Sequence, residues 1–79
     1  MILLKDRELK MVEVFKTNIQ QQRQAEILLA VLGQHFPQAR INFDLEDCDK
    51  ILRVEGKIVR ANQIIEIVNS NGYWCEVLE

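Results

Sequence analysis

The residues best suited to chemistry form one short acidic cluster, in which a cysteine lies between carboxylates. Cys48 is flanked by Glu46, Asp47 and Asp49. Thiolate sulfur and carboxylate oxygen are both metal ligands in proteins, so these four residues could hold a cation. Turns rich in aspartate are also common without any metal, because the side chain accepts hydrogen bonds from nearby backbone amides. Metal binding at this cluster is therefore an alternative, set beside a purely structural turn.

The other reactive side chains are explained by ordinary structural positions. Cys75 shares the strand parity of Val77, so we expect it to point into the core as a small hydrophobe. His35 falls near the expected end of the first helix, where a histidine is favourable without any ligand role. The chain has neither a glycine-rich phosphate loop nor a Gly-x-Ser-x-Gly motif. We expect no enzymatic activity, no catalytic residue and no cofactor.

Size and charge exclude several classes of function. A chain of 79 residues is enough for one small domain with one core. Its formal net charge of −2 and the lack of a basic stripe argue against nucleic-acid binding. No apolar run approaches the roughly 20 residues that span a bilayer, and Met1–Leu4 is too short for the core of a signal peptide. We therefore expect a cytoplasmic protein without a membrane or nucleic-acid partner.

The hydrophobic pattern predicts four strands and two helices behind an N-terminal extension, residues 1–9. Period-two alternation indicates strands, and apolar residues at i, i+3, i+4 and i+7 indicate helices. Thr17 and Gln20 fit a capping box that would start the first helix, and Pro37 would end it. The expected strands cover 10–16, 39–46, 51–55 and 73–78, and the second helix runs from Ala61 to Asn71-Gly72.

This order, strand-helix-strand-strand-helix-strand, predicts an α+β fold of the ferredoxin-like βαββαβ type. Two right-handed crossovers around one hairpin give a four-stranded antiparallel sheet in the order 4-1-3-2, with both helices on one face. Residues 10–79 would form this domain. The last strand and the hairpin tip would lie on opposite flanks of the sheet, too far apart for a Cys48–Cys75 disulfide.

Three stretches resemble the heavy-metal-associated domain family, the copper-chaperone-like modules. They are Ala39–Glu46 before the hairpin, Leu52–Gly56 after it, and Ile64–Val68 leading to Asn71-Gly72-Tyr73. The family's metal turn is Met-x-Cys-x-x-Cys, and an ungapped alignment places Ile19 at its methionine and Gln21 and Gln24 at its two cysteine ligands. A neutral amide oxygen cannot replace a thiolate for a soft ion. The resemblance thus implies the fold, and the family's soft-metal site is not carried over.

Strand alternation also predicts an apolar patch on the sheet face turned away from the helices. If Val12 and Val14 face the helices, the large residues of opposite parity face outward, because successive side chains alternate. These residues are Phe15, Trp74, Met11, Ile51 and Leu78. Such a patch usually marks contact with another molecule, although single exposed apolar residues are normal. An unknown protein partner, a second copy of the chain or Met1–Leu4 could cover it.

We therefore expect a small non-catalytic interaction module that resembles a heavy-metal-associated domain without its soft-metal site. The alternative is residual metal-ion binding, or an accessory role in metal homeostasis, through the acidic hairpin tip and Cys48.

Overall fold

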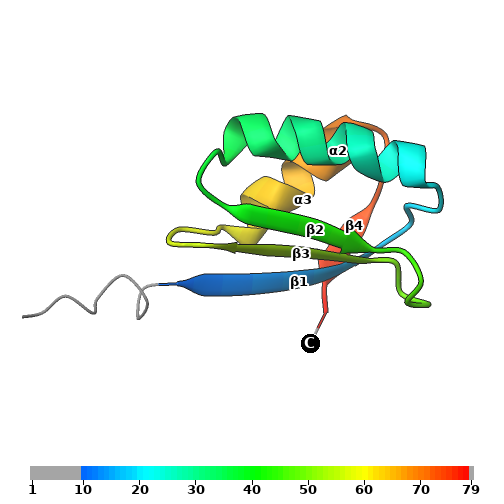
Figure 1. Ribbon diagram of the computed structural model, residues 1–79, viewed down its shortest axis with the longest axis horizontal. Coiled ribbons are helices and arrows are strands. Elements are labelled where there is room, and N and C mark those ends of the chain that lie inside the picture. The colour runs from blue at the N-terminus through cyan, green and yellow to red at the C-terminus, as the bar shows by residue number, and fades with distance from the viewer. Residues whose placement is uncertain (1–9, 79) are drawn as a thin grey trace, which may run out of the picture.

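The computed structural model describes residues 10–78, in which six elements follow one another in the expected order (Figure 1). The predicted extension, residues 1–9, lies outside the described residues. The elements are β1 (Met11–Thr17), α2 (Gln22–His35), β2 (Arg40–Asp44), β3 (Ile51–Gly56), α3 (Ala61–Ser70) and β4 (Cys75–Val77).

The four strands form one antiparallel sheet in the order β2-β3-β1-β4, which is the expected order 4-1-3-2 read in reverse. Both helices lie on the same side of this sheet, as Figure 1 shows. The predicted ferredoxin-like fold class is confirmed. We call the side under the helices the helix face and the other side the outer face.

The core lies between the helix face and the two helices. Phe15 of β1 is 0% exposed, and its register partner on β3, Leu52, is equally buried. From α2 and α3, the buried side chains are spaced by three or four residues, as expected for one face of a helix. They are Ala25, Leu28, Leu32, Ile64 and Val68.

The predicted start of the first helix is wrong by four residues. The helix begins at Gln22, with Gln21 as its N-cap, rather than directly after Thr17. The Gln24 side-chain oxygen accepts hydrogen bonds from the amides of Gln20 and Gln21, at 3.1 and 3.2 Å. A glutamine one turn into the helix therefore satisfies two amides that the helix start would otherwise leave unpaired. Its end at His35, before Pro37, agrees with the prediction.

Thr17 instead joins the end of β1 to the β2–β3 hairpin. Its side chain is buried; the hydroxyl donates to the Lys50 carbonyl at 2.7 Å and accepts from the Ile19 amide at 3.1 Å. The Thr17 amide donates to the Asp49 carbonyl at 3.0 Å. The hairpin tip thus lies beside the turn that leads into α2, as the topology predicted.

Neither α2 nor α3 is long and apolar enough to cross a membrane, and no other helix occurs among residues 10–78.

Candidate functional site

The orientation of β1 decides which residues the outer face presents. The sequence prediction placed Val12 and Val14 on the helix face and Phe15 on the outer face, and this prediction is wrong. Phe15 lies opposite Leu52, in the core, whereas Val14 lies opposite the exposed Arg53. Residues directly opposite each other in a sheet share one face, so Val12 and Val14 belong to the outer face.

The corrected outer face keeps an apolar patch, with a different membership. Trp74 is 43% exposed and Leu78 is 38% exposed, and both have the parity of the outward-facing Glu76. We define the outer patch as the apolar side chains that β1, β3 and the β4 segment present on this face. Its members are Val12, Val14, Ile51, Trp74 and Leu78.

Three of the five residues predicted to form this surface lie on it, and two do not. Trp74, Ile51 and Leu78 are on the outer face, where their role in interaction stays a prediction. Phe15 is in the core. Met11 is 43% exposed, but alternation gives it the parity of Phe15, at the first residue of the strand.

The sequence alone does not indicate the missing members, Val12 and Val14. Both strand faces of residues 11–17 carry apolar side chains, so alternation alone does not choose between them. The pairing of Phe15 with the buried Leu52 makes that choice.

One charged pair divides the outer patch, and a second group of charges borders it. Lys16 and Glu76 form an ion pair across β1 and β4 at 3.9 Å. Glu55 on β3 binds both Lys10 and Arg53, each at 3.3 Å. The hydrogen bond from Lys10, together with the positive charges nearby, lowers the pKa of the Glu55 carboxyl, so this carboxylate stays ionised. The Lys16–Glu76 pair therefore separates Trp74 from Val14 and Leu78, and the Glu55 group borders Val12.

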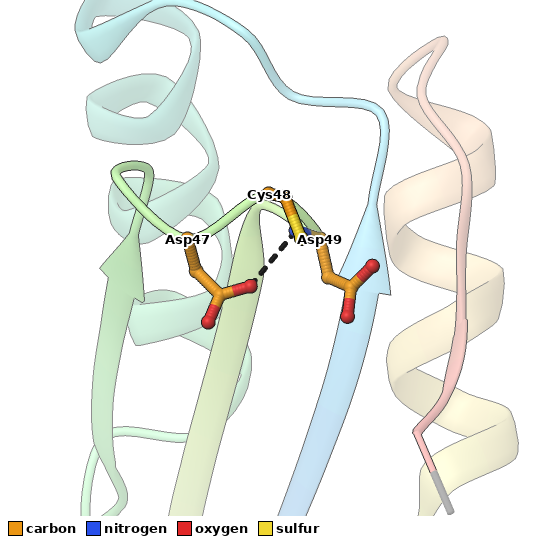
Figure 2. A group of neighbouring side chains, drawn as sticks. All are labelled: Asp47, Cys48 and Asp49. Atoms are coloured by element: carbon orange, nitrogen blue, oxygen red, sulfur yellow. Dashed lines mark hydrogen bonds between the residues drawn. The ribbon is translucent and has the colours of Figure 1, made fainter.

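The hairpin tip brings together three of the four predicted metal-ligand residues. Figure 2 shows Asp47, Cys48 and Asp49 around one turn, with ligand atoms that all lie within 4.8 Å of one another. Glu46 is not in this group. The Asp47 carboxylate also accepts a hydrogen bond from the Asp49 amide at 2.8 Å, which is the structural role expected of aspartate in turns. Both explanations of the acidic cluster therefore have a physical basis.

The turn that would carry a soft metal in the resembled family is organised by other interactions here. Ile19 is fully buried, and Gln24 caps the first turn of α2. Asn18 exchanges hydrogen bonds with Trp74: its side-chain oxygen accepts from the Trp74 amide at 2.8 Å, and its amide donates to the Trp74 carbonyl at 3.2 Å. These bonds hold Trp74 in place at the edge of the outer patch.

The two cysteines have opposite environments. Cys48 is exposed, whereas Cys75 is 3% exposed and lies in the core. Burial disfavours the thiolate and raises the pKa of the Cys75 thiol to about 11. The prediction that Cys75 points into the core is confirmed.

Comparison with known proteins gives no relative: no protein-family model matches this chain, and no curated protein or solved structure is significantly similar to it. The resemblance to heavy-metal-associated domains stays a prediction.

Ionisation of Cys75 should make stability depend on alkaline pH. Between pH 9 and 11 the unfolded chain loses this proton while the folded chain keeps it, so the free energy of unfolding falls as pH rises. Raising the pKa of the Cys75 thiol from 9.0 to about 11 corresponds to a loss of about 2 to 3 kcal/mol in the free energy of unfolding by pH 11. Urea unfolding at several pH values measures this loss in Cys48→Ser. The double variant Cys48→Ser/Cys75→Ala, which lacks the buried thiol, is the control. Equal pH slopes for the two proteins would contradict the assignment.

Proposed function

We propose that this domain is a non-catalytic interaction module and that the outer patch is its contact surface. The observation that carries the proposal is the position of Trp74. The Trp74 side chain remains exposed on the sheet face opposite the helices, which no described element covers (Figure 1). Two hydrogen bonds between the Trp74 backbone and Asn18 hold this residue in place. Tryptophan is strongly enriched among the residues that dominate binding energy at protein interfaces.

The surroundings of Trp74 support this role. Val12 and Leu78 are also exposed, at 46% and 38%. Val14 lies beside Leu78, because the Leu78 amide donates to the Val14 carbonyl at 2.8 Å, and Val12 is two residues away on the same face of β1. The Lys16–Glu76 pair lies within the same face. Protein interfaces combine exposed apolar side chains with polar and charged ones. The cytoplasmic location expected from the sequence stays a prediction.

Site-specific photocrosslinking tests the contact surface. A benzophenone amino acid at position 74, introduced in cells of the source organism, should give discrete adducts. The matched control is position 27 on α2, where Ile27 is 51% exposed. Replacing Val12 and Leu78 by serine should weaken the adducts from position 74 at least tenfold, because it removes apolar area around the crosslinker. Identical adducts from both positions, or adducts that the serine variant leaves unchanged, would contradict the proposal.

A second candidate function is binding of a divalent ion at the hairpin tip, and the spacing of Asp47, Cys48 and Asp49 favours it. One thiolate and two carboxylate oxygens form a donor set that suits zinc, which accepts sulfur and oxygen ligands in a tetrahedral site. Such a set supplies three protein ligands and leaves a fourth position for water. The ion would lie beside the start of α2, because the tip is bonded to Thr17.

Calorimetric titration with Zn(II) distinguishes a site from a turn. Asp47→Asn keeps the oxygen that accepts the Asp49 amide and removes one negative charge, so it should weaken zinc binding at least tenfold without unfolding the hairpin. Cys48→Ser should weaken it further. Glu46→Gln is the charge-matched control, because Glu46 lies outside the group of ligand atoms. No heat from the unaltered protein, or equal losses in Asp47→Asn and Glu46→Gln, would reject the site.

A further inference from the structure

The β2 strand forms an open edge of the sheet. It pairs with β3 on one side, and none of the other described strands lies on its second side. An exposed edge presents unpaired amide and carbonyl groups that can bind another strand. β2 has five residues, Arg40-Ile41-Asn42-Phe43-Asp44, which is a usual length for a strand that pairs.

The hydrogen-bond pattern shows which residues of β2 present these groups. The Leu78 amide donates to Val14, so even-numbered residues of β1 direct their backbone toward β4 and odd-numbered ones toward β3. Hydrogen-bonded and non-hydrogen-bonded residue pairs alternate along each antiparallel pair of strands, so the register fixes which residues of β3 and β2 face each neighbour. Backbone groups of Arg40, Asn42 and Asp44 then face β3, and those of Ile41 and Phe43 face the open edge.

Two opposite charges lie at equal distances from the centre of β2. Arg40 and Asp44 lie at the two ends and share the outer face with Asn42 between them. In residues 10–78 neither Arg40 nor Asp44 forms an ion pair. Glu55, the residue opposite Arg40, is already bound by Lys10 and Arg53.

We propose that two copies of this chain associate through β2, antiparallel and related by a twofold axis at Asn42. This register places Arg40 of each copy opposite Asp44 of the other. It also places Ile41 opposite Phe43, so that all the backbone groups at the open edge are hydrogen-bonded between the copies. A twofold interface uses the same surface on both subunits, and this strand is complementary to itself.

The surroundings of the strand favour the same orientation. The end of β2 at Arg40 lies near Lys10 and Arg53, whereas the end at Asp44 leads into Glu46 and the acidic hairpin tip. Antiparallel pairing brings the basic end of one copy beside the acidic end of the other. Ile41 and Phe43 are half-buried against the core, so their pairing extends the apolar layer under the helices.

This association is independent of the proposed contact through the outer patch, because it uses a strand edge rather than a sheet face. The dimer would have one continuous sheet with both outer patches on the same face, one towards each end of the sheet.

Charge reversal tests the pairing. Sedimentation equilibrium should show a dimer of the unaltered chain, and Arg40→Asp or Asp44→Arg alone should raise its dissociation constant at least tenfold, because like charges then face each other. An equimolar mixture of these two variants should form a heterodimer, because each then supplies the charge that the other needs. Both positions are exposed, so circular dichroism should show an unchanged fold. Glu76→Lys on the opposite flank of the sheet is the control and should leave the constant unchanged.

Disulfide crosslinking tests the register. In a Cys48→Ser background, Asn42→Cys should form an intermolecular disulfide on mild oxidation, because this register brings the two Cα atoms to about 4.5 Å. Arg53→Cys, one strand further in, should not crosslink, because about 14 Å would separate the two copies of that position.

Three results would overturn the proposal: a monomer at millimolar concentration, a dimer that charge reversal does not weaken, or equal crosslinking at positions 42 and 53. A dimer that Trp74→Ser dissociates and Arg40→Asp does not would place the association on the outer patch instead.

Discussion

The structure depends on one constraint, the burial of Phe15 against Leu52 at the centre of the sheet. β1 pairs with β3 on one side and β4 on the other, so its orientation determines what both faces of the sheet present. With Phe15 and Thr17 on the helix face, Val12 and Val14 must face outward. The hydroxyl of Thr17 supports the same orientation, because its bonds to Lys50 and Ile19 form only with the side chain inside.

The two proposed contact surfaces follow from that orientation and from the strand order. Most apolar side chains of the outer face lie on β1 and the β4 segment, together with the Lys16–Glu76 pair, whereas β2 and β3 present mainly polar and charged residues there. The two proposed contacts therefore use different parts of the sheet: the outer patch lies beside β4, and the β2 edge lies on the opposite flank. The hairpin tip lies beside the turn from β1 into α2, where Thr17 fixes it.

Much of this architecture could be predicted from the sequence, because the elements away from β1 carry unambiguous patterns. Ile41 and Phe43 alternate cleanly with polar residues, and Ile64 and Val68 mark the inner stripe of α3. β1 carries apolar residues on both parities, and only tertiary pairing selects one of them. The start of α2 was missed because Thr17 has a capping residue's chemistry but uses its hydroxyl across the sheet. The outer patch was therefore expected in the right place, with Phe15 and Met11 wrongly included.

The measurement that tests the orientation of β1 most directly is paramagnetic relaxation of side-chain protons by an inert gadolinium chelate in solution. The structure predicts strong relaxation of the Val12 and Val14 methyl groups, and protection of the Phe15 ring together with the Val54 and Val68 methyl groups. Protected methyl groups at Val12 and Val14, with a strongly relaxed Phe15 ring, would show that the strand faces the other way. That result would remove the basis for the outer patch described above.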